Sequence, residues 1–136
     1  RPLIFNNNDG GATYAAAYTA GDIIGVALDC TNNKLYFSKN GAWSNGSGAW
    51  SSSTFDAAVG AKTITAPAST TLGGYYPSQT FWSGSGGTFS LNFGQGFFGT
   101  TAVASANAEA NGNGIMEYPV PSGFYTLNTK NIKEFG

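Results

Sequence analysis

Carboxylates are the side chains best suited to acid–base chemistry in this chain, because it contains no histidine. A glycosidase needs two of them on opposite sides of a sugar bond, about 5–9.5 Å apart. Asp22 and Asp29 lie at the ends of expected strands, where an aspartate commonly bonds turn backbone. Their odd spacing would also point them to opposite faces of a regular strand. The acidic residues are Asp9, Asp22, Asp29, Asp56, Glu109, Glu117 and Glu134.

The remaining acids and nucleophiles add no catalytic arrangement. Glu109 and Glu117 lie in or beside low-complexity sequence and are expected only to solubilise it. The Ser-His-Asp and Cys-His arrangements of nucleophilic catalysis are impossible without histidine. We therefore predict no catalytic residue and no enzymatic activity.

Metal binding is not predicted either. Cys30 is the single cysteine, so it forms no internal disulfide and lacks the spacing of a zinc site. It is expected to pack as a small apolar residue. The segment "NNNDGG" at 6–11 lacks the alternating oxygen ligands and terminal glutamate of a calcium loop, so a polar turn is expected. No metal and no cofactor are predicted.

Binding is better supported, because rigid aromatic side chains occur among small polar residues. Trp43 and Trp50 lie in a Ser/Gly/Asn-rich segment, and Tyr75 and Trp82 lie near another turn. This is the composition of antibody-like recognition loops. Aromatic faces beside amides and carboxylates also suit sugars. The predicted binding residues are Trp43, Asn45, Trp50, Asp56, Tyr75 and Trp82.

The competing interpretation is structural. Trp43 and Trp82, at strand borders, would then fill the core. For Trp50, in the middle of the segment, exposure or contact with another subunit remains equally open.

The composition is typical of a single all-β domain with many turns. The chain has 136 residues with 20 glycines, only 10% charged residues and 15% aromatic residues, enough to build a core. The net charge is −1 and the basic residues are scattered, so no nucleic-acid partner is expected. No apolar run approaches the roughly 18 residues that would span a membrane.

The clearest strand pattern is a hairpin within residues 21–41. Turns are predicted at 31–33 and 39–41, where Asn40-Gly41 suits a type I′ turn. Tyr36 is predicted to point outward. Period-2 alternation predicts five inward side chains, Ile24, Val26, Leu28, Leu35 and Phe37.

Further elements follow along the chain. Residues 42–56 are interpreted as a long loop, and strands are expected at 63–66 and within 73–82. The segment "TFSLNFG" at 88–94 alternates strictly and predicts a half-buried strand with Phe89, Leu91 and Phe93 inward.

The C-terminal part is expected to be irregular. Residues 100–114 are small and low in complexity, which indicates either a flexible loop or a weak helical turn at 104–110. Residues 118–136 form an extended, proline-stiffened tail in this interpretation.

Three segments resemble, in this order, the SPRY domain. They are "GDIIGVALDCTNNKLYFSKNG", "YYPSQTFWSGSGGTFSLNFGQ" and "PSGFYTLNTKNI". The resemblance implies an antiparallel β-sandwich of the concanavalin-like jelly-roll kind. The last segment is similar to the end of SPRY-like domains in bacteriophage virion proteins, which implies a virion location.

The sequence departs from that family pattern in places. The family's strands before residue 6 are missing, so residues 1–136 are expected to be one SPRY-like domain and a fragment of a larger chain. The segment 42–66 is longer than usual, and 100–114 is an apparent insertion.

The predicted function is a non-enzymatic virion module in a tail, fibre or capsid exterior. It would mediate protein–protein contact or host-surface attachment. Its partners would be other virion subunits, in a homo-oligomer or multi-subunit assembly that covers exposed sheet edges, and a host surface glycan or protein. A lectin-like carbohydrate-binding module is the alternative.

Overall fold

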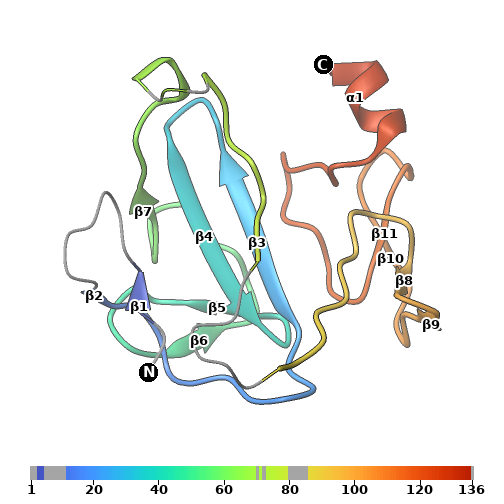
Figure 1. Ribbon diagram of the computed structural model, residues 1–136, viewed down its shortest axis with the longest axis horizontal. Helices are drawn as coiled ribbons and strands as arrows, with labels where there is room; N and C mark the ends of the chain where they lie inside the picture. Colours follow the sequence, from blue (N-terminus) through green and yellow to red (C-terminus); the bar gives the residue numbers. More distant parts are fainter. Residues whose placement is uncertain (1–2, 5–11, 70, 72, 80–85, 136) are drawn as a thin grey trace. The chain divides into compact units, whose positions relative to one another are not determined.

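The computed structural model describes residues 3–4, 12–69, 71, 73–79 and 86–135 (Figure 1). Every named sheet in this part is antiparallel, and helix is confined to one short 3₁₀ turn and one short α-helix. The all-β prediction is therefore confirmed. The chain divides into two compact units, Arg1–Gly73 and Gly74–Gly136, called the first and second unit below.

The first unit is built on a five-stranded antiparallel sheet. Its order is β3-β4-β5-β6, and β7 pairs with the free part of β4. A separate ribbon joins β1 to β2, and the 3₁₀ turn η1 spans Pro67–Ser69. The strands are β1 (Leu3–Ile4), β2 (Ala12–Thr13), β3 (Ile24–Asp29), β4 (Lys34–Lys39), β5 (Ala42–Ser44), β6 (Trp50–Ser52) and β7 (Lys62–Thr63).

The predicted hairpin is confirmed as β3 and β4, paired from Ile24↔Lys39 to Asp29↔Lys34. The Asn-Gly turn is also as predicted. Asn40 has φ 49° and Gly41 has φ 80°, the left-handed pair that a type I′ turn requires. Asn40 secures the turn because its Oδ1 accepts a hydrogen bond from the Ile23 N–H at 2.8 Å.

The predicted faces of this hairpin were wrong. Tyr36 is the most shielded residue of the two hairpin strands, at 3% exposure, whereas Val26 is 62% exposed. The Tyr36 ring packs edge-on against Phe55, which packs edge-on against Trp43, both with ring centroids 5.0 Å apart. Both faces carry apolar residues, so alternation alone could not show which face these rings would cover.

The predicted long loop at 42–56 was also wrong. Within it, β5 and β6 pair around a tight turn, with a register shift at Trp43/Ser44. Asn45 Oδ1 accepts hydrogen bonds from the backbone N–H groups of Ser47 and Ala49. The glycine and serine residues therefore build a turn between two short strands.

The second unit contains short ladders and one helix. Its 104–110 segment holds a short strand, so the weak helical turn, one of the two alternatives left open there, is not formed, and the tail ends in a helix rather than staying extended. The elements are β8 (Phe97–Phe98), β9 (Thr101–Ala102), β10 (Asn107–Ala108), β11 (Ile115–Met116) and α1 (Thr129–Phe135), with β8 paired to β9 and β10 to β11.

The strand predicted at 88–94 is absent, and its side chains Phe89 and Leu91 are exposed. Amide side chains explain the failure. Asn92 Oδ1 accepts from the N–H groups of Gly94 and Gly96, and Gln95 Nε2 donates to the Leu91 carbonyl. These bonds satisfy the backbone locally, so the segment turns instead of pairing.

The two weaker strand predictions have mixed outcomes. Lys62–Thr63 overlaps the strand expected at 63–66. Residues 73–79 contain no strand, and residues 80–82 of the strand expected within 73–82 lie outside the described residues. None of the helices in the described part of the chain has the length and apolar character needed to cross a bilayer.

Candidate functional site

The predicted aromatic site residues of the first unit are each engaged in structural contacts. Trp43, on β5, is half-buried and packs on Phe55. Trp50, on β6, donates its indole N–H to the Ala16 carbonyl at 2.8 Å. Pairing of β5 with β6 places Trp43 and Trp50 on one ribbon, closed by the Asn45 turn.

The other predicted binding residues have separate outcomes. Asp56 Oδ1 accepts from the Ala58 N–H at 2.8 Å and so closes the turn after Phe55. Tyr75 is half-buried and belongs to the second unit. Trp82 lies outside the described residues. A binding role for these six residues remains a prediction.

The turn-capping role predicted for Asp22 and Asp29 is confirmed. Asp22 Oδ2 accepts from the Thr19 N–H at 2.8 Å, and this bond is the main cause that lowers the pKa of the Asp22 carboxyl. Asp29 accepts from both the side chain and the backbone of Asn32, which lowers its pKa. Asp22 therefore holds the turn that leads into β3, and Asp29 holds the turn that joins β3 to β4.

Sequence reasoning missed a buried carboxylate in the second unit. Glu109 is 3% exposed, so the prediction that it merely solubilises the chain was wrong. Its Oε2 accepts from the Thr126 N–H and its Oε1 from the Asn131 side-chain amide, both at 2.5 Å. A buried carboxylate is tolerated when such donors satisfy its oxygens.

An amide–carboxylate network is formed by Glu109, Thr126, Asn128 and Asn131. Asn128 is the N-cap of α1, since its Oδ1 accepts from the backbone N–H groups of Lys130 and Asn131, each at 3.0 Å. Its Nδ2 donates to Thr126 Oγ1 at 2.6 Å. The "LNTKN" segment of the SPRY resemblance therefore works here as a helix cap joined to a buried carboxylate.

Two glycines allow the backbone to approach this network closely. A Cβ added at Gly94 would lie 2.6 Å from Thr126 Oγ1, and one added at Gly114 would lie 2.0 Å from the same atom. Gly94 also has φ 105°, in the left-handed region. The "LNFGQ" and "NGNG" segments are thus packed against Thr126.

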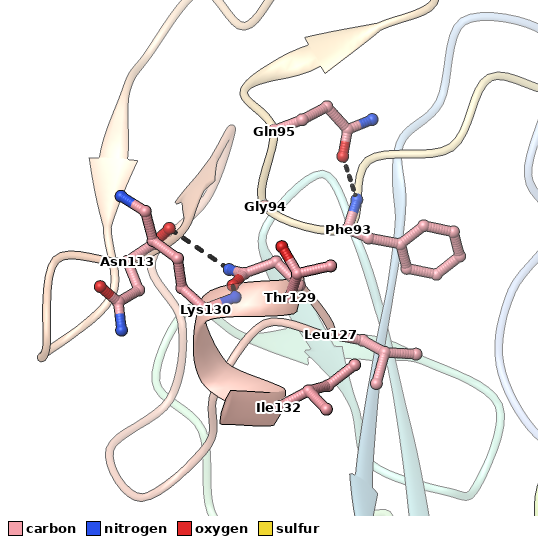
Figure 2. A pocket seen from close by; sticks show the side chains of 9 residues that line it. Phe93, Gly94, Gln95, Asn113, Leu127, Thr129, Lys130 and Ile132 are labelled. Atoms are coloured by element: carbon pink, nitrogen blue, oxygen red, sulfur yellow. Dashed lines mark hydrogen bonds between the residues drawn. The ribbon is translucent and has the colours of Figure 1, made fainter. Parts of the chain in front are cut away.

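An open groove of about 420 Å³ lies beside the network. One side, called the apolar wall, is formed by Phe93, Leu127 and Ile132, whose side chains project in the same direction in Figure 2. Leu127 is 57% and Ile132 is 55% exposed. The other lining side chains are polar and include Gln95, Asn113, Asn128, Thr129 and Lys130.

The polar side of the groove is held rigidly. Gln95 Oε1 accepts from the Phe93 N–H at 2.6 Å, and Asn128 Nδ2 donates to the Asn113 carbonyl at 3.3 Å (Figure 2). Among the residues that the structure describes, Lys130 is the one ionisable side chain that lines the groove, and no carboxylate lines it. The groove therefore combines an exposed apolar side with a hydrogen-bonded polar side.

The described residues contain no group of three or more cysteine, aspartate or glutamate side chains placed to hold a metal ion. Comparison with protein-family models, with curated proteins and with solved structures found no match.

Proposed function

We propose that this chain is a non-enzymatic binding module that contacts another protein through the apolar wall. The observation that carries the proposal is the exposure of Phe93, Leu127 and Ile132 together on one side of a groove. Exposed apolar side chains that gather on one surface often mark an interaction site, whereas apolar side chains scattered singly do not. The network beneath them keeps the surface ordered, which lowers the entropy cost of binding.

The hydrogen bonds that the acidic residues accept support a role without catalysis. Asp22, Asp29 and Asp56 each accept bonds from turn backbone. Glu117 accepts from the backbone N–H groups of Ala104 and Ser105. These bonds give each carboxylate a structural role in holding its backbone segment, as expected for a binding module.

The SPRY-like segments lead us to place this module in a bacteriophage virion, as part of a tail, fibre or capsid exterior. Its partner would then be a neighbouring virion subunit or a protein of the host surface. A sugar-binding role has less support, because the Trp43 ring is packed on Phe55 and the Trp50 indole N–H is bound to Ala16.

The proposal is tested with Leu127→Asp and Ile132→Asp in the full protein, with Val59→Asp as the matched control. Val59 is exposed like the other two but lies in the first unit. Circular dichroism establishes that each variant is folded. We expect the first two variants to lose incorporation into the particle, or adsorption of the particle to its host, while the control retains both. Unchanged incorporation and adsorption of all three would refute the proposal.

A further inference from the structure

Strand β3 is an edge strand. The sheet order ends at β3, and among the described residues only β4 pairs with it. An edge strand presents a row of backbone donors and acceptors that can pair with another chain.

The register shows which backbone groups face outward. The Asn40 N–H donates to the Ile23 carbonyl at 2.8 Å, so the polar groups of Ile23 point toward β4. In an antiparallel ladder this direction alternates from residue to residue. The N–H and C=O groups of Ile24, Val26 and Leu28 therefore point away from β4, at the open edge.

Within the described residues, the sequence of β3 carries little of the usual protection of an edge strand. Natural edge strands carry lysine, proline or a bulge, or are very short. β3 has six residues, "IGVALD", with continuous pairing to β4 and a charge only at its last residue. Val26, in its middle, is 62% exposed.

We propose that β3 pairs with β3 of a second copy of this chain across a two-fold axis. An antiparallel register centred on Val26 sets each outward residue against another outward residue. Val26 then faces its own counterpart, and Ile24 faces Leu28 of the second copy. Asp29 faces Ile23 of the second copy, so no like charges lie directly opposite each other.

Self-complementarity favours a second copy over an unrelated strand. The proposed register pairs apolar side chains with apolar side chains on one face, and Gly25 with Ala27 on the other. A closed two-fold contact of this kind also removes both exposed edges at once. The proposal goes beyond the protein-binding role of the apolar wall and uses a different surface.

The first test is sedimentation equilibrium of the full chain, from low micromolar to near-millimolar concentration. We expect a concentration-dependent dimer. Val26→Pro removes an outward donor but no β3–β4 bond, and it keeps the position apolar. It should weaken dimerisation by about 10-fold or more. Val26→Ala, which keeps the donor, is the matched control and should weaken it less.

The second test fixes the register by cross-linking in a Cys30→Ser background. Directly opposed side chains have Cβ atoms about 4.5–5.5 Å apart, near disulfide range. Under mild oxidation Val26→Cys should form a covalent dimer by itself. Leu28→Cys should not, unless it is mixed with Ile24→Cys chains.

The outcomes are distinct. A folded chain that stays monomeric throughout overturns the proposal, as does a dimer that Val26→Pro leaves unchanged. Efficient self-cross-linking at Leu28→Cys but not Val26→Cys overturns the register. Leu127→Asp should leave the dimer intact, so failure of the proposed function and failure of the edge pairing are separable.

Discussion

The two units bury different kinds of side chain. In the described residues, the buried hydrophobic side chains all lie in the first unit, namely Tyr14, Ala15, Ala27 and Tyr36. The second unit instead buries Glu109, Thr126 and Asn131, joined by hydrogen bonds. In a core of packed rings, the loss in unfolding free energy grows with the volume of the side chain that is removed. In a buried polar network, the loss of one partner leaves another polar group unsatisfied, which is costly in itself.

The largest effect should come from the first unit. Tyr36→Ala removes a buried ring that packs on Phe55 and donates its hydroxyl to the Ala57 carbonyl. We expect a loss of about 3–5 kcal/mol in unfolding free energy, measured by denaturant titration with tryptophan fluorescence. Tyr76→Ala, at an exposed tyrosine of the second unit, is the control and should change little. Equal effects would contradict a ring-packed first unit.

Glu109→Gln tests the second unit and is nearly isosteric. One oxygen that accepts a bond becomes an NH₂ group facing a donor, the Thr126 N–H or the Asn131 amide. We expect a cost of about 1–3 kcal/mol in the same titration. Glu134→Gln alters an exposed residue and should cost much less. If Glu109→Gln leaves the unfolding free energy unchanged, the network does not need the charge of Glu109.

Asn128→Ala removes the cap of α1, which should cost about 1 kcal/mol. Hydrogen exchange should accelerate at the amides of Lys130 and Asn131, which donate to Asn128. Asn128→Ser restores a capping oxygen, so it should recover part of the protection. Unchanged exchange in the alanine variant would mean that packing alone holds the helix.

The smallest effect is a pH dependence in the first unit. The pKa values of Asp22 and Asp29 are lowered in the folded chain by hydrogen bonds to Thr19 and Asn32. Their contribution to stability is therefore present above the unfolded pKa and lost as pH falls through the lowered folded value. The unfolding free energy should be measured by denaturant titration at a series of pH values from 7 downward through the lowered folded pKa. Asp22→Asn should make its decrease with falling pH smaller. A steeper loss in the variant would contradict the assignment.

Sequence patterns predicted the local features that depend on neighbouring residues. The β3–β4 hairpin, the Asn40-Gly41 turn and the capping role of Asp29 all follow from short-range chemistry. The alternation of "TFSLNFG" failed, because side-chain amides three residues apart satisfied the backbone before any partner strand could.

The candidate site could not be predicted in the same way. Glu109 looks solvated in sequence because its donors, Thr126 and Asn131, lie 17 and 22 residues away. No local pattern reports a contact of that separation. Phe93 was predicted to face inward from a half-buried strand and Leu127 to lie in an extended tail, whereas the structure assigns both to one groove.

The close approach of Gly94 and Gly114 to Thr126 sets a rule for substitution over evolutionary time. Relatives that preserve this backbone path should keep glycine at both positions for as long as residue 126 carries a branched side chain. Exchange of Gly114 should appear only together with shrinkage at 126, whereas Gly94, with φ 105°, should resist exchange even then, a difference that sequencing of natural variants would reveal.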